Sequence, residues 1–354
     1  MKEVAIIGAG ITGLTAAWKL QQQGIPVRIF EKRNQPGGSI RTIEENGYLV
    51  EEGPNTLQLS SHEHEEFLKD LGLENELIDT SPTAKNRFLV RYGAPLAAPL
   101  SPLQFLKTPL FSKKAKCRLL LEPFIFRPNY KTEETLANFV QRRLGHEMLD
   151  YAINPFVGGI YAGDPEKLSL QYGFPKLYRL EKNYRSLILG TLKLQRQKKR
   201  EGTLYKTRSV SFKSGLQALP VAIARDLGEQ LILNAHIHQI TKSNKWRISW
   251  SDKEGNNHDD LFDAVISAIP ANSLPLIDFG ITSQHLLSPL SEIYHPPVTS
   301  IAMGFRKEDI PHDLDGFGML VPSKEPFHIL GTLFSSSLFP NRAPKDHILL
   351  TTFI

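Results

Sequence analysis

The sequence predicts an α/β and α+β chain with more than one compact unit, and three observations lead to this fold class. The apolar run Val4 to Ile7 leads directly into a glycine-rich turn and a helical pattern, which is the order of a buried parallel strand and its helix. The chain has 354 residues, more than one hydrophobic core usually organises. Residues 95–128 are basic and rich in proline, with leucine and phenylalanine between the charges.

The composition excludes several classes of protein. Hydrophobic residues make up 41% and charged residues 22% of the chain, which is typical of a globular protein. Cys117 is the single cysteine, so a disulfide framework and a cysteine-based metal site are excluded, and a reducing compartment is favoured. The apolar run at the start is too short for a secretory signal, and no apolar stretch approaches the roughly 18–20 residues that span a bilayer. We expect a soluble or peripheral protein.

The net charge of +5 conceals an uneven distribution. Residues 95–208 carry a net charge of +12, and the rest of the chain carries −7. A basic middle within an acidic chain predicts an anionic surface or partner for that middle. A solvated basic face is the alternative on charge alone.

The elements at the N-terminus form a dinucleotide-binding pattern. After the first strand, Gly8, Gly10 and Gly13 suit a tight turn, a close approach to pyrophosphate and close packing of helix on strand. The helical periodicity ends at Gly24, and a second strand at residues 27–30 ends on Glu31, whose carboxylate can accept hydrogen bonds from ribose hydroxyls.

The glycine pattern after Glu31 favours FAD over NAD as the cofactor. Gly37 and Gly38 follow the acidic residue closely, which resembles the extended signature of FAD-dependent amine oxidases. The later sequence Gly53-Pro54-Asn55-Thr56 predicts a fixed bend with exposed amides, suited to a flavin ring.

Further blocks resemble one family over essentially the whole chain, the oxygen-dependent protoporphyrinogen oxidases. A central block reads NPFVGGIYAGDP from Asn154 to Pro165, and the other matching blocks are Gly53 to Gln58, Phe174 to Leu177, Ser211 to Leu216, Phe317 to Glu325, Leu330 to Ser336 and Phe339 to Pro344. The resemblance implies a Rossmann-like FAD-binding domain (1–75 and 205–275), a mixed-sheet substrate domain (76–94 and 276–354) and an inserted helical membrane-binding domain (95–204).

The resemblance also implies individual contacts. FAD is expected to contact the first glycine turn, whose residues are Gly8, Ala9, Gly10, Ile11, Thr12 and Gly13. It is also expected to contact Glu31, Lys32, Ser39, the bend at Gly53, Pro54, Asn55 and Thr56, and the backbone of Ile237 on an alternating strand over residues 231–237. Arg87 matches the arginine that pairs with a substrate propionate. The positions matching the walls of the tetrapyrrole pocket are Phe317, Gly318, Leu320, Leu333 and Phe353. The apolar strand 264–269 is expected to be buried and to return to the FAD-domain sheet.

No side chain is assignable as a catalytic group, because the flavin itself accepts the hydride at its N5 atom. The pairs His62 with His64 and His236 with His238 lack a third ligand, so no metal site is expected. No nucleic-acid partner is expected either. The implied reaction is a stepwise oxidation of a porphyrinogen by dioxygen, with hydrogen peroxide as the second product.

The basic middle of the chain predicts contact with anionic lipid, because apolar residues and lysines alternate with prolines there. We expect a cytoplasmic enzyme that is peripheral on the membrane face. A homodimer and a hand-off of product to the next enzyme of the haem pathway are left open. The chain ends at Ile354, where the family continues with a glycine pair and a further segment, so the sequence is expected to be incomplete at its C-terminus.

Three alternatives remain open on the sequence. The first is oxidation of coproporphyrinogen, a more carboxylated ring, which Arg87 alone does not exclude. The second is an amine oxidase or carotenoid desaturase of the same superfamily. The third is a non-catalytic flavin-binding or membrane-binding fragment.

Overall fold

The computed structural model describes residues 2–125, 133–200, 205–280 and 284–354. The chain divides into two compact units, Met1–Asp79 with Thr207–His295, and Thr80–Lys206 with Pro296–Ile354. Phe126, Arg127 and Pro128 of the basic stretch lie outside the described residues. The division into three domains stays a prediction.

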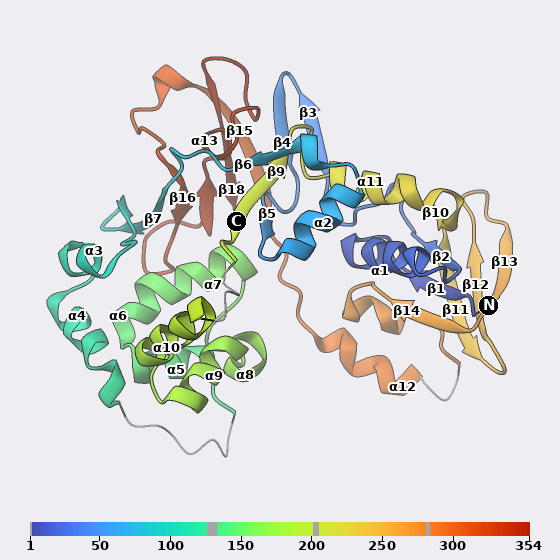
Figure 1. Cartoon of the computed structure of the whole chain (residues 1–354), viewed down its shortest axis with the longest axis horizontal. Coiled ribbons are helices and arrows are strands. Elements are labelled where there is room, and N and C mark those ends of the chain that lie inside the picture. The colour runs from blue at the N-terminus through green and yellow to red at the C-terminus, as the bar shows by residue number, and fades with distance from the viewer. Residues whose placement is uncertain (1, 126–132, 201–204, 281–283) are drawn as a thin grey trace. The chain divides into compact units, whose positions relative to one another are not determined.

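A parallel sheet forms the centre of the first unit (Figure 1). Strand β1 (Val4–Ile7) pairs with β2 (Val27–Phe30) on one side and β14 (Ala264–Ser267) on the other, and β10 (Leu231–Ile232) lies outside β2. Both faces of β1 are covered, which is why all four of its residues are buried. Its continuous apolar run is therefore the pattern of a buried parallel strand, as predicted.

Different layers cover the two faces of this sheet. Val4 and Ile6 belong to a core that includes residues of α1 (Ile11–Gln22), α2 (His62–Asp70) and α11 (Ala218–Leu227). Ala5 and Ile7 belong to a second core with the antiparallel sheet β11 (His236–Lys242), β12 (Trp246–Ser251) and β13 (Asn257–Phe262). Helices α1 and α11 contact each other on the first face (Figure 1).

Two sequence predictions about this sheet are wrong in part. The single strand expected over residues 231–237 is divided into β10 and β11, which belong to different sheets, because Asn234 turns the backbone with φ 56°. The segment at 264–267 does return to the sheet, but it forms an edge strand and Ile266 is 37% exposed. An edge strand has a neighbour on one side only, so an apolar sequence does not guarantee burial.

Smaller elements complete the first unit. A hairpin of β3 (Thr42–Glu45) and β4 (Tyr48–Glu51) turns at Asn46 and Gly47, whose φ angles of 51° and 78° suit a tight hairpin. A three-stranded sheet has the order β5-β9-β6. The bounds are β5 (Leu57–Leu59), β6 (Leu77–Asp79), β9 (Arg208–Phe212) and α12 (Gln284–Leu287), with short helical turns at Glu74–Glu76, Gly228–Gln230, Ala271–Leu276 and Ser288–Glu292.

The second unit contains a mixed six-stranded sheet in the order β15-β18-β17-β16-β7-β8. The pairing of β7 with β16 is parallel and the other pairings are antiparallel. The bounds are β7 (Asn86–Arg91), β8 (Ala94–Ala97), β15 (Ser300–Arg306), β16 (Gly316–Leu320), β17 (Gly331–Leu333) and β18 (His347–Phe353). The predicted mixed sheet is confirmed.

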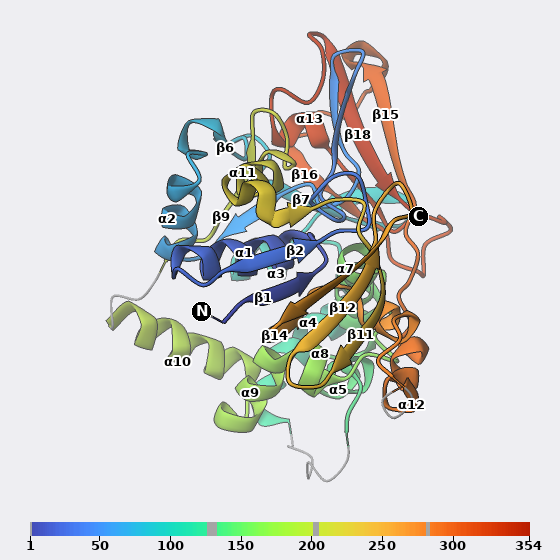
Figure 2. The same cartoon turned by 90° about the vertical axis from the view of Figure 1, so that its right-hand side faces the viewer.

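Helices form the rest of this unit, and Figure 2 shows α9 and α10 side by side. Their bounds are α3 (Pro102–Lys107), α4 (Lys113–Leu120), α5 (Leu136–Arg143), α6 (His146–Met148), α7 (Asn154–Tyr161), α8 (Leu170–Gly173), α9 (Pro175–Tyr184), α10 (Leu187–Arg200) and α13 (Ser335–Leu338), with a π-helical turn at Leu149–Ile153 and short turns at Glu122–Phe124 and Lys307–Asp309. In the described part of the chain, no helix is long and apolar enough to span a membrane.

A buried ion network joins these helices. The Arg143 guanidinium is fully buried and donates to the carboxylates of Glu122 and Glu181, which are themselves fully buried. Glu122 also accepts from the Ser186 hydroxyl at 2.6 Å and from the Leu187 amide at 3.0 Å, at the start of α10. Each buried charge therefore has an opposite charge or a hydrogen-bond donor beside it, as burial requires.

Candidate functional site

The turn between β1 and α1 has a separate reason for each of its three glycines. Gly8 has φ +96°, a conformation that disfavours other residues. A Cβ on Gly13 would lie 1.9 Å from the Gly8 carbonyl oxygen, so the helix packs too closely on the turn for a side chain. A Cβ on Gly10 would meet nothing within 4 Å, so the backbone is open there to an incoming group.

The N-terminus of α1 is free to hold an anion. Gly10 is its N-cap and supplies no side-chain hydrogen bond, and the first turn has no acidic residue. The unpaired amides of a helix N-terminus and the helix dipole favour a phosphate group. The structure therefore gives this turn the features that a pyrophosphate requires.

The Glu31 carboxylate braces the loops around this turn. It is 6% exposed, and its Oε2 accepts from the Ala9 amide at 2.7 Å while its Oε1 accepts from the Arg33 amide at 2.9 Å. Carboxylate oxygens have two acceptor sites each, so both retain capacity for a ribose hydroxyl. Arg33 in turn donates to the Gly38 carbonyl at 2.7 Å.

The second glycine pair lies against the first turn. The Gly37 amide donates to the Ala9 carbonyl at 2.8 Å, and a Cβ on Gly38 would lie 3.1 Å from the Cα of Gly10. The bend predicted to face the flavin ring also comes close, because a Cβ on Gly53 would lie 2.0 Å from the Ser39 carbonyl oxygen. Close backbone contact explains these glycines.

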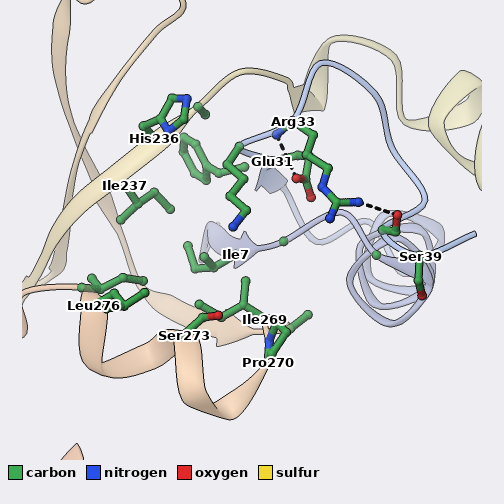
Figure 3. A pocket seen from close by; sticks show the side chains of 18 residues that line it. Ile7, Glu31, Arg33, Ser39, His236, Ile237, Ile269, Pro270, Ser273 and Leu276 are labelled. Carbon is green, nitrogen blue, oxygen red and sulfur yellow. Dashed lines mark hydrogen bonds between the residues drawn. The ribbon is translucent and has the colours of Figure 1, made fainter. Parts of the chain in front are cut away.

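A cavity of about 450 Å³ opens beside these loops, within the range of about 300–1,000 Å³ of small-molecule sites. In Figure 3, Glu31 and Arg33 lie on one side of the cavity. His236 and Ile237, at the start of β11, line a second side. Pro270, Ser273 and Leu276 come from the turn after β14 and line a third side. The cavity is therefore built from three segments far apart in the sequence.

Some predicted cofactor residues line the cavity and others do not. Those that line it are Gly8, Gly10, Glu31, Lys32, Ser39 and Ile237. Ala9 and Gly13 are buried behind the turn, and Ile11, Thr12, Gly53, Pro54, Asn55 and Thr56 do not line the cavity. Among the described residues, no group of three suitable side chains could hold a metal ion.

Sequence reasoning missed several residues of the cavity wall. Arg33 and His236 stand next to predicted residues, so only their neighbours were identified. Ile269, Pro270, Ser273, Leu276 and Ile277 come from the return of the chain after β14. A prediction of the register in which β14 pairs with β1 could have identified these residues after β14 as part of the cavity wall.

The described residues fit FAD. The open backbone at Gly10 and the uncapped helix suit the pyrophosphate, and the cavity between Glu31 and Ile237 has apolar walls at Ile269 and Leu276 for a ring with a ribose. These features are complementary to the adenosine half of a dinucleotide.

The expected substrate residues meet on the sheet of the second unit. Arg87 lies on β7, Phe317 and Leu320 on β16, Leu333 on β17 and Phe353 on β18. The guanidinium carbon of Arg87 lies 4.9 Å from the centre of the Phe317 ring. The pairs Leu320 with Gly331 and Gly331 with Phe353 put Leu320, Leu333 and Phe353 on one face of the sheet.

This face is apolar and only partly covered. Phe317, Leu320, Leu333 and Phe353 are half-buried, and Arg87 is exposed. Helix α7 comes close to it, since a Cβ on Gly159 would lie 2.3 Å from the Cδ2 of Leu320. The glycine pair of the central block is therefore a point of close helix–sheet contact.

Comparisons with known proteins agree with the fold and the cofactor. Residues 11–354 match the model of the family described as flavin containing amine oxidoreductase. A solved structure of reduced UDP-galactopyranose mutase has a TM-score of 0.73 at 18% identity, covering 100% of this chain and 74% of that one. Putrescine oxidase bound to putrescine has a TM-score of 0.68 at 16% identity, covering 100% and 75%. At such identities the structures show the fold alone.

Relatives of higher sequence identity show to which group within this family the chain is most similar. Protoporphyrinogen oxidase 2 of Arabidopsis thaliana is 36% identical over 100% of this chain and 75% of its own length. The mitochondrial protoporphyrinogen oxidase of Nicotiana tabacum is 35% identical with the same coverage. Coproporphyrinogen III oxidase of Bacillus subtilis is 29% identical, covering 100% and 77%.

These matches confirm the predicted α/β and α+β fold, the flavin cofactor and the prediction of an oxidoreductase, while the inserted membrane-binding domain stays a prediction. The chain belongs to the flavin-containing amine oxidoreductases and, within them, to the protoporphyrinogen oxidase family.

Proposed function

We propose that the protein oxidises protoporphyrinogen to protoporphyrin, with FAD as cofactor and dioxygen as electron acceptor, in haem biosynthesis. The observation that carries this proposal is Arg87, whose guanidinium stands over Phe317 at the edge of a half-buried apolar sheet face. A flat apolar macrocycle with carboxylate arms needs such a face and a guanidinium that can hold a carboxylate by two hydrogen bonds. The family of the chain and its plant relatives support the same substrate.

The chain's own residues would bind and orient the reactants. The open amide at Gly10 and the N-terminus of α1 would hold the pyrophosphate, and Glu31 would fix the ribose while it keeps the loop at Ala9 in place. Arg87 would pair with a propionate, and Leu320, Leu333 and Phe353 would contact the macrocycle. The bound flavin supplies the two-electron acceptor. Three successive two-electron oxidations then convert a porphyrinogen to the porphyrin. The two electrons of each oxidation pass on to one dioxygen.

Coproporphyrinogen remains the nearest alternative substrate. It carries four carboxylates. The described sheet face has one guanidinium without a carboxylate partner, that of Arg87, because Arg91 on the same face of β7 is paired with Glu147. The plant relatives are more similar to the chain than the Bacillus subtilis coproporphyrinogen III oxidase, at 36% against 29% identity. Both observations favour the substrate with two carboxylates.

The helical part of the second unit is proposed to bind an anionic membrane surface. Within residues 95–125, the described part of the basic stretch, six apolar side chains are at least half exposed: Leu100, Leu103, Leu106, Leu120, Leu121 and Phe124. Lys113 and Lys114 are exposed on α4 in the same segment. Apolar contact and attraction to anionic headgroups together favour peripheral binding. We place the enzyme at the cytoplasmic face of a membrane, and a homodimer and a hand-off of product stay predictions.

The test of the proposed function is turnover by the purified protein loaded with FAD. Protoporphyrinogen and oxygen should give fluorescent porphyrin with hydrogen peroxide in a three-to-one ratio of peroxide to porphyrin. We expect a higher kcat/KM for protoporphyrinogen than for coproporphyrinogen. The reverse preference would move the assignment to the alternative, and porphyrin formation without peroxide would exclude dioxygen as the acceptor.

A further inference from the structure

The Arg87 guanidinium has an aromatic ring as its neighbour instead of a carboxylate. The ring of Phe317 lies 4.9 Å from the guanidinium carbon, and among the described residues no salt bridge to Arg87 is found. A guanidinium within about 6 Å of a ring centre is attracted to the face of the ring. Among the described residues no hydrogen bond from the Arg87 side chain is found either, so its N–H groups remain available to a ligand carboxylate.

The strand register explains how Phe317 reaches this position. On β16 and β7, Gly316 pairs with Asn86 and Met319 pairs with Phe88, so three steps on one strand match two on the other. This β-bulge lets Met319 pack in the core with Phe88. It also puts both Phe317, which contacts Arg87, and Leu320, which packs with Leu89, on the opposite face. A regular strand cannot put residues three apart on one face.

Gly318 makes this bulge feasible. Its φ of +151° is rare for residues with a side chain, and a Cβ there would lie 2.3 Å from the Thr332 carbonyl oxygen. The glycine is therefore required by the backbone, whether or not it also contacts a ligand. Because Gly318 allows the bulge, the Phe317 ring lies against the Arg87 guanidinium.

We propose that Phe317 is a positioning residue that fixes the direction of the Arg87 guanidinium for a ligand carboxylate, and that the bulge at Gly318 keeps the ring in place. A long and exposed arginine side chain otherwise samples many rotamers, and ordering it on binding costs affinity. The ring reduces this cost before the ligand arrives. This inference rests on the proposed function, because it takes a porphyrinogen carboxylate as the ligand.

The experiment compares a porphyrin dicarboxylate with its ester. Protoporphyrin and its dimethyl ester, both presented in detergent micelles, are titrated against the FAD-loaded protein by fluorescence, and KM and kcat are measured with protoporphyrinogen. For F317L we expect the dissociation constant of the free acid and KM to rise about two- to fivefold, the size of an exposed cation–π contact. The dissociation constant of the ester should rise by less than that of the free acid, because a contact of the Phe317 ring with the macrocycle affects both ligands alike. F317Y, which keeps the ring, should behave as the wild type.

Two further variants sharpen the result. In R87Q the preference for acid over ester should disappear, and F317L should have no further effect in that background. F327L changes a phenylalanine that is 44% exposed elsewhere in the same unit, and it should leave all constants unchanged.

Equal weakening of acid and ester by F317L would show that the ring is a wall of the pocket, and it would overturn the positioning role. Failure of F317Y to restore the wild-type constants would overturn it as well. A wild-type protein that neither binds protoporphyrin nor oxidises protoporphyrinogen would overturn the proposed function, and the inference with it. A wild type that does both while F317L matches it would overturn the inference alone.

Discussion

The Glu31 carboxylate and the Ala9 amide are joined by a buried hydrogen bond of 2.7 Å that ties the end of β2 to the glycine turn after β1. The other oxygen of the same carboxylate accepts from the Arg33 amide at 2.9 Å. The acid that a ribose would contact therefore also shapes the turn that a pyrophosphate would contact. Both parts of the proposed cofactor site would therefore depend on one side chain.

Replacement of Glu31 by glutamine should weaken FAD binding. A glutamine has one acceptor oxygen, so either the Ala9 or the Arg33 amide loses its partner. The remaining oxygen then has less capacity for a ribose hydroxyl, and loss of that hydrogen bond to a charged group costs about 1.5–3 kcal/mol, which is roughly a 10- to 100-fold rise in the dissociation constant of FAD. Calorimetric titration of the apoprotein with FAD measures it. The exposed Glu44→Gln is the matched control, and equal affinities of the two variants would contradict the role of Glu31.

Two glycines of the turn should respond differently to alanine. Gly10→Ala adds a methyl group into open space at φ −66°, so the apoprotein should melt as the wild type does, while FAD binding falls because the methyl group blocks the pyrophosphate. Gly13→Ala places its methyl group 1.9 Å from the Gly8 carbonyl oxygen, so the apoprotein itself should lose stability. Thermal unfolding with and without FAD separates the two effects. An unstable Gly10→Ala apoprotein with normal FAD affinity would contradict this division of roles.

Glu147 should make stability depend on pH. Burial alone would raise the pKa of this carboxyl, but hydrogen bonds from Ser112 and the ion pair with Arg91 outweigh it and hold the pKa below the ordinary value of 4.5. A lowered pKa means that the stabilisation is complete above pH 4.5 and is lost as the pH falls through the folded value. Glu147→Gln should therefore cost about 1–3 kcal/mol near neutral pH and progressively less below pH 4.5.

Urea unfolding at several pH values measures this difference. Exposed Glu166→Gln is the control, because it changes the same charge in the same unit without an ion pair in the described residues. A constant difference between wild type and Glu147→Gln down to low pH would contradict the electrostatic origin.

Charge reversal on α4 should weaken membrane binding. Lys113→Glu with Lys114→Glu replaces two exposed cations, and each cation near an anionic surface contributes about 1 kcal/mol, so binding should fall at least about tenfold. Flotation with vesicles that contain phosphatidylserine, at low and high salt, measures it. Lys116 is left intact because its ammonium donates to the carbonyls of Leu106 and Thr108 and so belongs to the fold.

Lys69→Glu with Lys253→Glu, two exposed lysines of the first unit, is the control for net charge. Binding that is insensitive to salt and equal in both double variants would contradict the proposed membrane surface.

The first unit could be predicted from the sequence where its structure is local. Strand, glycine turn and helix follow one another within Val4–Ile7 and Ile11–Gln22, and Gly8 and Gly13 each have their own steric reason. The error at residues 231–237 has a local cause as well. Alternation of apolar residues continues across Asn234, but the positive φ there turns the backbone, and asparagine tolerates this conformation without interrupting the pattern.

The rest of the site depends on long-range pairing. Ile269, Ser273 and Leu276 reach the cavity because β14 pairs with β1 across more than 250 residues, in a register that no local pattern fixes. The contact of Arg87 with Phe317 likewise depends on a bulge between two strands far apart in the chain. The family resemblance gave these two residues as substrate contacts, but not their relationship to each other.

The most direct test of the central claim is reduction of the bound flavin in the absence of oxygen. We expect protoporphyrinogen, added to protein that holds one FAD per chain, to remove the visible absorbance of the oxidised flavin, and oxygen to restore it. A flavin that stays oxidised in the presence of protoporphyrinogen would contradict the proposed function.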